Sequence, residues 1–262
     1  MIILKITGLS KEQLFLAPKI EERFIHQIEQ ALKRLEDWEP VEYIIETSEF
    51  YWLDFFVDPR VLIPRNDTEI MVDCVLNELL EKNTYNLIDV WTGSSCIPIS
   101  IIKNSENILK SYVIDISKSA IDVAKINIKK HWLGKVIEPI HWNLLNNFIE
   151  NKKYVFNENI IITANLPYIK NWDFKNMDPE VVTFEPDSAL YWGKKTGFEL
   201  YEELIKQAIA LKKQCNINNI LLFIEIWFDQ KEISEMYLNT LGLKFDVFKD
   251  NWWIERCIRI EI

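Results

Sequence analysis

The sequence predicts an α/β protein with a doubly wound, mainly parallel sheet of seven strands, a C-terminal antiparallel hairpin and a small N-terminal helical segment. From residue 86 onward, runs of β-branched and aliphatic residues alternate with amphipathic stretches of helical spacing, which is typical of parallel strands joined by crossover helices. The last two runs, 243–248 and 254–262, have no helix between them, which indicates an antiparallel pair at one edge of the sheet.

The first 40 residues are expected to form the helical segment. Ser10 followed by Gln13 is a capping-box pattern that begins one helix. A second helix is expected from about Pro18 to Leu35, where apolar residues recur at helical spacing.

Residues 41–66 are interpreted as a β-hairpin linker, with its turn near Thr47–Glu49. Residues 67–262 follow as one domain, which opens with a helix cap at Asp67 and Thr68. In this domain we expect helices at 69–82, 96–103, 118–130, 198–213 and 229–239, a long loop after 164, and strands at 86–90, 111–116, 136–140, 159–164, 219–226, 243–248 and 254–262.

Composition and charge narrow the class of protein. The 262 residues are 48% hydrophobic, enough for a sizeable core, and carry a net charge of -10. A surface of that sign disfavours broad contact with nucleic-acid phosphates. Four scattered cysteines without a CxxC pair argue against a metal site or a disulfide framework. Because there is neither a signal-peptide pattern nor an apolar run of membrane length, we expect a cytoplasmic protein that does not bind membranes.

The stretch LIDVWTGSSC, residues 87–96, changes from a buried strand to a loop of small residues. A nucleotide-type cofactor loop begins in this way after the first strand of an α/β sheet, although Trp91 stands where such a loop usually needs glycine. Asp115 ends the next strand, 26 residues after Asp89, where an acidic residue accepts hydrogen bonds from ribose hydroxyls. On these features alone, a plain turn with an exposed aspartate remains an equal alternative.

A second group of polar atoms follows the strand 159–164, in the stretch ANLPY. Asn165 offers an amide oxygen and Leu166 offers a backbone carbonyl. Tyr168 adds a flat ring, and Pro167 restricts the turn. Ligands bind at the carboxyl edge of α/β sheets, so two acceptors and a platform here suit a planar group that carries an NH2. The alternative is a proline-bearing turn with a core tyrosine.

From about Pro40 to the C-terminus the chain resembles class I S-adenosylmethionine-dependent methyltransferases. It most resembles the HemK-type enzymes that methylate the glutamine side-chain nitrogen of peptide-chain release factors. The stretches that carry this resemblance are SEFYWLDFFVDPRVLIPRNDTEIMVD, LIDVWTGSSCIPISI, VIDISKSAIDVAKINI, ANLPYI, FEPDSALYWGKKTGFELYEELI and IEIWFDQ. The resemblance implies S-adenosylmethionine as the cofactor and the glutamine-bearing loop of a release factor as the partner, with residues 1–40 as a shortened substrate-binding segment.

The same resemblance assigns residues to the site. It implies that Asn165 and Leu166 accept the two hydrogens of the glutamine amide, while Pro167 and Tyr168 shape the acceptor side. The residues that it implies for cofactor binding are Arg65, Glu69, Asp89, Trp91, Thr92, Gly93, Ser94, Asp115, Ile116, Asn143, Leu144 and Asn165. For the first two of these, a salt bridge at the start of the helix is the alternative.

Three departures from the family pattern stand out. Leu166 replaces the first proline of Asn-Pro-Pro-Tyr but keeps the backbone carbonyl. Asn143 stands where an aspartate often lies near the adenine. Tryptophan also replaces family glycines, at Trp38, Trp52, Trp91, Trp192, Trp227 and at least one of Trp252 and Trp253, with Trp132 and Trp142 as further candidates.

The chain has 10 tryptophans and only 6 glycines, whereas the usual share of about 7% would give roughly 18 glycines. We hypothesise that the gene reads UGA as glycine and that the sequence as written reads it as tryptophan. The alternative is a genuinely tryptophan-rich homologue whose loops are remodelled.

Two other functions remain open at this point. An adenine-N6 methyltransferase of RNA or DNA would hold a planar NH2 with the same asparagine and carbonyl, and would stack Tyr168 on the base. The LIPRNDTE and FEPDSAL runs and the acidic charge favour the glutamine enzyme. If Trp91 is genuine and closes the pocket, the chain would instead be a binding protein without a cofactor.

Overall fold

The fold was analysed in a computed structural model, which describes residues 1–16, 19–81, 83–151, 154, 156, 158–168, 179–190 and 196–262. Trp172 and Trp192 lie outside these ranges, as do parts of the long loop after residue 164. Among the described residues, none of the helices combines the length and the apolar character needed to cross a lipid bilayer.

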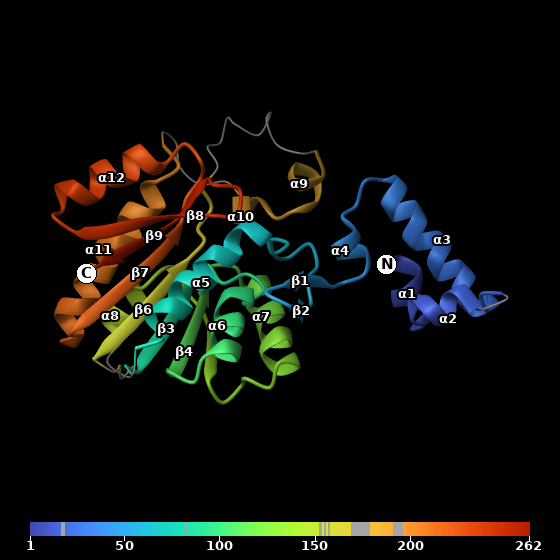
Figure 1. Cartoon of the computed structure of the whole chain (residues 1–262), viewed down its shortest axis with the longest axis horizontal. Helices are drawn as coiled ribbons and strands as arrows, with labels where there is room; N and C mark the ends of the chain where they lie inside the picture. The colour runs from blue at the N-terminus through green and yellow to red at the C-terminus, as the bar shows by residue number, and fades with distance from the viewer. Residues whose placement is uncertain are drawn as a thin grey trace.

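Seven strands form one sheet in the order β5-β4-β3-β6-β7-β9-β8 (Figure 1). Their bounds are β3 (Tyr85–Val90), β4 (Ile108–Asp115), β5 (Ile137–His141), β6 (Asn159–Ala164), β7 (Asn219–Glu225), β8 (Lys244–Lys249) and β9 (Glu255–Glu261). Strands β3 to β7 pair in parallel, whereas β9 runs antiparallel to both β7 and β8. The expected seven-stranded, mainly parallel sheet with a terminal antiparallel hairpin is therefore confirmed.

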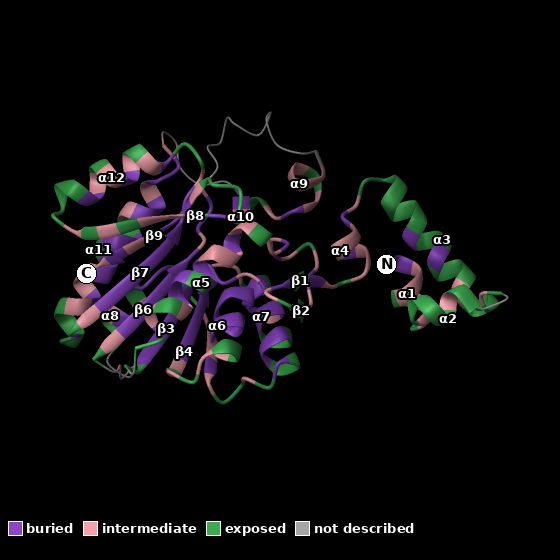
Figure 2. Ribbon diagram, viewed as in Figure 1, coloured by how far each residue is buried: buried purple, intermediate pink, exposed green. Residues whose placement is uncertain are grey.

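Helices cover both faces of the sheet. Their bounds are α5 (Glu69–Glu78), α6 (Cys96–Asn104), α7 (Lys118–Lys130), α8 (Asn146–Glu150), α9 (Pro179–Phe184), α10 (Asp187–Leu190), α11 (Glu199–Cys215) and α12 (Lys231–Thr240). Ile88 and Ile162 share a buried cluster with side chains of α8, α11 and α12, whereas their neighbours Leu87 and Ile161 join a cluster with α5 and α6. The strands are thus buried on both faces (Figure 2).

The N-terminal part contains α1 (Ile2–Thr7), α2 (Lys11–Leu16), α3 (Glu22–Glu36), α4 (Val41–Ile44), β1 (Ser48–Phe50), β2 (Leu53–Phe55) and the 3-10 turn η1 (Asn66–Thr68). Helices α1 to α3 stand to one side of the sheet, and α4 and the hairpin connect them to it (Figure 1).

Several elements differ from the expectations. The apolar start of the chain forms α1, and α8 to α10 are single turns too short for a periodic signal. Residues 41–44 are helical rather than extended, because one helical turn places Tyr43 in the core, where its hydroxyl donates to the Val61 carbonyl over 2.7 Å. The hairpin turn lies at Tyr51 and Trp52, not near residues 47–49.

Candidate active site

The strand register brings three loops to one edge of the sheet. Val90 of β3 is paired with Ile114 of β4 on one side and with Ala164 of β6 on the other. The loops that follow these strands therefore start side by side. Strand order reverses between β3 and β6, and such a switch point is where α/β sheets bind ligands.

Asp115 holds the loop after β3 in place. Its Oδ2 accepts a hydrogen bond from the Gly93 N–H over 3.0 Å, and its Oδ1 accepts one from the Ser117 N–H over 2.8 Å. Burial raises the pKa of Asp115 to about 6, although both backbone donors oppose this shift. The carboxylate also lines a cavity beside Thr92, Gly93 and Ser94.

Asp89 lies beneath this loop rather than in its cavity. The Thr163 hydroxyl donates to its Oδ1 over 2.6 Å, and its Oδ2 has no direct hydrogen-bond partner in the part of the chain that the structure describes. Burial raises the pKa of Asp89 to about 7, with the Thr163 hydrogen bond opposing the shift. Asp89 therefore joins β3 to β6 through a buried polar contact that no sequence motif indicated.

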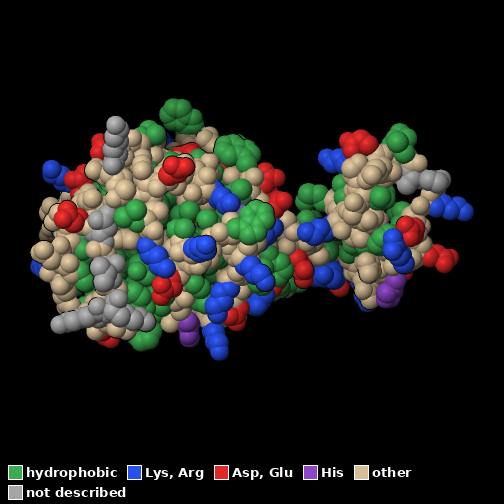
Figure 3. All heavy atoms as spheres, turned by 90° about the horizontal axis from the view of Figure 1, so that it is seen from below, with side chains coloured by type: hydrophobic (Ala, Val, Ile, Leu, Met, Phe, Trp, Pro, Cys, Tyr) green, Lys and Arg blue, Asp and Glu red, His purple; other side chains and the backbone are tan. Residues whose placement is uncertain are grey.

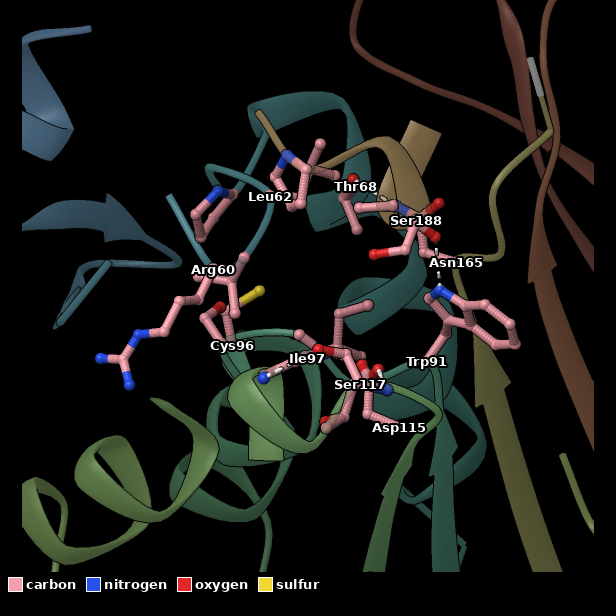
Figure 4. Close-up of a pocket in the computed structure, with 18 of the residues that line it drawn as sticks. Arg60, Leu62, Thr68, Trp91, Cys96, Ile97, Asp115, Ser117, Asn165 and Ser188 are labelled. Atoms are coloured by element: carbon pink, nitrogen blue, oxygen red, sulfur yellow. Dashed lines mark hydrogen bonds between the residues drawn. The ribbon is translucent and has the colours of Figure 1, made fainter. Parts of the chain in front are cut away.

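The cavity at the ends of β3 and β4 is small, with a volume of about 60 Å³. Trp91 fills the space beside it: the side chain is 9% exposed, and its Nε1 donates to the Ser188 carbonyl over 3.1 Å (Figure 4). Its backbone φ is 65°, in the left-handed region. Pockets for small molecules usually measure roughly 300–1,000 Å³, so this cavity, which Trp91 helps to line, is smaller than such a pocket.

Arg65 and Glu185 tie together the two segments that cover the cavity. They form an ion pair of 2.5 Å across 120 residues of chain. Burial raises the pKa of Glu185 despite the favourable charge of Arg65. Glu69 does not pair with Arg65, since its Oε1 accepts from the Tyr51 N–H over 2.8 Å. The alternative of an Arg65–Glu69 salt bridge is therefore wrong, and Glu69 lies outside the lining of the cavity.

Asn165 lies in the wall between this cavity and a second one of about 770 Å³. Its Nδ2 donates to the Thr68 hydroxyl over 3.4 Å. Leu166 is buried, and its N–H donates to the Tyr201 hydroxyl over 3.0 Å. Tyr168 lines the second cavity and is stacked on Trp227, with ring centroids 5.4 Å apart. Two of the expected catalytic residues, Asn165 and Tyr168, thus line these spaces, whereas Leu166 lines neither.

Comparison with solved structures shows which fold the chain has. The solved catalytic domain of human Mettl16 bound to an RNA hairpin has a TM-score of 0.59 at 14% identity, covering 91% of this chain and 81% of that one. The ribosomal protein L11 methylase of Lactobacillus delbrueckii subsp. bulgaricus has a TM-score of 0.50 at 17% identity, covering 78% and 82%. At these identities the likeness shows the fold alone, which is that of class I methyltransferases.

Relatives in sequence are closer. The release factor glutamine methyltransferase of Mycoplasma mycoides is 35% identical over 241 residues, covering 90% of this chain and 81% of that protein. The enzyme of the same name from Thermodesulfovibrio yellowstonii is 32% identical over 264 residues, covering 99% and 90%. The chain belongs to the release factor glutamine methyltransferase family. It spans about half the length of the bifunctional methyltransferases of Rickettsia prowazekii and related species, and no family model matches it.

The buried carboxyl group of Glu225 lies next to the Tyr168 hydroxyl, and the sequence analysis of this methyltransferase did not single it out. Glu225 is 3% exposed and its Oε1 accepts from the Tyr168 hydroxyl over 3.4 Å, while its Oε2 has no direct partner among the described residues. Burial raises the pKa of Glu225 to about 6, and Thr68 and Arg256 oppose the shift. The IEIWFDQ stretch, which contains Glu225, was the signal in the sequence that could have pointed to it.

Besides Glu69, Asp89 and Leu166, four more of the implied site residues lie outside both cavities. Asn143 is exposed after β5, Ile116 is half-buried after β4, and Leu144 is buried with a φ of 50°. Pro167 is buried between the two acceptor-side residues. None of the four lines either space.

Proposed function

We propose that the protein transfers a methyl group from S-adenosylmethionine to the side-chain amide nitrogen of a glutamine in a peptide-chain release factor. The observation that carries this proposal is the place of Asn165, in the wall that the small cavity and the large cavity share. Methyl transfer needs such a boundary, because donor and acceptor must meet in line across it. The names of the relatives support the choice of acceptor.

The small cavity matches S-adenosylmethionine in its polar groups but not in its volume. The Gly93 backbone and the buried Asp115 carboxylate offer the contacts that a ribose-bearing ligand requires. With Trp91 bonded to Ser188, however, only about 60 Å³ remains. Binding of the cofactor, which would supply an activated methyl group on a sulfonium, would therefore require the indole of Trp91 to move away from Ser188 or to be absent.

On the acceptor side, Asn165 and Leu166 would hold the amide. The Asn165 Nδ2 is engaged by Thr68, so its Oδ1 is left to accept one amide hydrogen. The Leu166 carbonyl, which accepts from the Tyr201 hydroxyl over 3.4 Å, would use its second lone pair to accept the other. An amide nitrogen is a poor nucleophile, so holding it in line is the main task, and well-oriented reactants can lower a barrier by roughly 7–11 kcal/mol.

The large cavity supports a protein acceptor. Its lining reaches from Tyr168 and Glu225 at the sheet edge to Met1 and Glu42 of the N-terminal part. We propose that residues 1–40 contact the release factor, residues 41–66 link them to the sheet, and the loop with the glutamine enters this cavity toward Asn165.

The test uses the chain with Trp91→Gly, a release factor and S-adenosylmethionine, followed by mass spectrometry of the peptide that bears the glutamine. Ribosomal RNA incubated in parallel serves as the second acceptor. A methylated glutamine that disappears with Asn165→Ala is the expected result. Methylated adenine with an unmodified release factor would instead establish the adenine enzyme, and binding of cofactor without any transfer would reject both.

A further inference from the structure

Tryptophan in this chain occupies backbone conformations that normally belong to glycine. Five of the eight described tryptophans have a positive φ: Trp38 (65°), Trp52 (58°), Trp91 (65°), Trp132 (58°) and Trp253 (65°). Four of the five described glycines also have a positive φ. In all the rest of the described chain, only Glu46, Tyr51, Ser95, Leu144 and Asn216 have a positive φ. A side chain with a Cβ is disfavoured in this region, most of all a bulky one.

Two of these tryptophans end helices at the position that selects glycine. At the end of α3, the Trp38 N–H donates to the Leu35 carbonyl over 3.1 Å and the Glu39 N–H donates to the Arg34 carbonyl over 3.0 Å. This pair of bonds is a Schellman motif with Trp38 at its left-handed residue, where glycine is preferred.

The end of α7 repeats the motif around Trp132, whose N–H donates to the Lys129 carbonyl over 3.1 Å while the next N–H donates to the Ile128 carbonyl over 2.9 Å. An internal control lies at the end of α12. There the Gly242 N–H donates to the Asn239 carbonyl over 3.1 Å, and the next N–H donates to the Leu238 carbonyl over 3.2 Å. The left-handed residue of this motif is Gly242.

Two more tryptophans lie in tight turns. Tyr51 and Trp52 are the two central residues of the β1–β2 hairpin, both with positive φ, and the second position of such a turn favours glycine. Trp253 ends the turn between β8 and β9, where its N–H donates to the Asp250 carbonyl over 3.0 Å. A left-handed residue after a hairpin turn is again a glycine position.

The indole side chains at these four turns lie outside the hydrophobic core. Trp38, Trp52, Trp132 and Trp253 are 70% to 85% exposed, and hydrophobic side chains protrude from the surface of the molecule (Figure 3). Their ring contacts are with other surface groups, such as Lys103 over Trp132 and Lys249 over Trp253. Exposed contacts of this kind contribute about 0.5–1 kcal/mol, which is less than the roughly 1–2 kcal/mol that the left-handed conformation costs.

Position 91 combines the same backbone with a functional consequence. Trp91 is left-handed, follows β3 directly and turns its ring onto Ser188 (Figure 4). A glycine there would keep the bend, remove the ring and join the space that it fills to the cavity lined by Gly93, Asp115 and Asn165.

We propose that positions 38, 52, 91, 132 and 253 are glycine in the natural protein, specified by UGA codons, and that the glycine at position 91 completes the cofactor site. The part about the cofactor rests on the proposed function; the part about the backbone does not. Of the positions drawn from the family pattern, a positive φ supports 132 and favours 253 over 252, whereas 142 and 227 have no positive φ and stay predictions from the pattern alone.

The decisive experiment is tandem mass spectrometry of the protein purified from the cells that naturally make it, together with the codons of its gene. Glycine at the five positions, each encoded by UGA, is the expected result. Tryptophan in the corresponding peptides, encoded by UGG, overturns the proposal whatever the enzyme does.

A second experiment tests the physical claim on recombinant chains. Trp253→Gly is compared with its neighbour Trp252→Gly, since both side chains are nearly equally exposed, at 79% and 77%, but only position 253 has a positive φ. We expect the first substitution to raise the melting temperature by roughly 2–4 °C and the second to lower it or leave it unchanged. Equal shifts for both would overturn the claim about the backbone.

Calorimetry with S-adenosylmethionine separates the two proposals. The chain as written should show no binding and Trp91→Gly should show saturable binding. If mass spectrometry finds glycine at position 91 but Trp91→Gly binds no cofactor, the proposed function fails and the glycine assignment stands. If it finds tryptophan and that chain binds the cofactor, the glycine assignment fails and the proposed function stands.

Discussion

The indole nitrogen of Trp91 donates a hydrogen bond to the backbone carbonyl of Ser188 over 3.1 Å, and both residues line the cavity where the loops after β3 and β4 meet. We expect Trp91→Gly to gain affinity for S-adenosylmethionine, because it removes the ring and relieves a left-handed Cβ. Calorimetry measures the gain, and Trp132→Gly, at a remote exposed turn, is the matched control that should leave affinity unchanged.

The stability of Trp91→Gly shows whether the indole fills a ligand site or is part of the hydrophobic core. If the indole fills a site meant for a ligand, its loss should change the melting temperature little. A cost above about 3 kcal/mol, the size expected for deleting a well-packed aromatic side chain, would show that Trp91 is a true core residue. The cofactor site would then not have the shape proposed for it.

Trp38→Gly and Trp132→Gly should each stabilise the protein. Both residues take the left-handed place of a Schellman motif, where a Cβ costs roughly 1–2 kcal/mol, and glycine removes this cost without disturbing the two bonds. Part of the gain is offset, since glycine loses more conformational entropy on folding. We expect about 1 kcal/mol each in urea unfolding, against no gain for Trp142→Gly, whose φ is not positive. A loss of stability at both turns would contradict the assignment.

The sequence predicted the sheet because the hydrophobic periodicity of strands and helices is a local signal that is present in each βα unit. It also predicted that residues 91, 115 and 165 follow strands of one sheet, and the register brings those strand ends together. It could not predict the pairing of Arg65 with Glu185 or the anchoring of Leu166 by Tyr201, because both join segments that are far apart in the chain. Such contacts depend on how loops pack against each other, and loop packing leaves no periodic pattern in the sequence.

Asn165→Ala should abolish methyl transfer while leaving cofactor affinity nearly intact. The amide lines both cavities, and its Nδ2 donates to Thr68, which leaves Oδ1 to accept from the glutamine amide in the proposed mechanism. Because a small misplacement of reactants can cost about 100-fold in rate, we expect a loss of at least that size in the Trp91→Gly background. Turnover within a few-fold of the parent would remove Asn165 from the mechanism.

Asp115→Ala should weaken S-adenosylmethionine binding, again in the Trp91→Gly background. The carboxylate lines the cavity and would accept from ribose hydroxyls, and a hydrogen bond to a charged group contributes about 1.5–3 kcal/mol. It also holds the Gly93 and Ser117 N–H groups, so the substitution should lower the melting temperature as well. Asp115→Asn keeps an acceptor for one of these bonds and is the milder control. Unchanged affinity in both variants would place the ribose contact elsewhere.

Glu225 should make the free energy of unfolding depend on pH. Burial raises its pKa from 4.5 to about 6 in the folded protein, where Tyr168, Thr68, Arg256 and Asp67 surround it. The folded state therefore holds the proton more tightly than the unfolded state. The stabilisation is fully present below about pH 4.5 and is lost as the pH rises through about 6, by about 2 kcal/mol for a shift of this size.

Glu225→Gln removes this dependence, because an amide does not titrate but can still accept from the Tyr168 hydroxyl. The difference in free energy of unfolding, variant minus parent, should be about 2 kcal/mol larger at pH 7 than at pH 4.5. Urea unfolding at the two pH values measures this difference, and the dependence on Asp89 and Asp115 cancels because both chains contain them. A difference that does not change with pH would mean that Glu225 titrates near its ordinary value, so that its buried oxygen is solvated or paired in the folded protein.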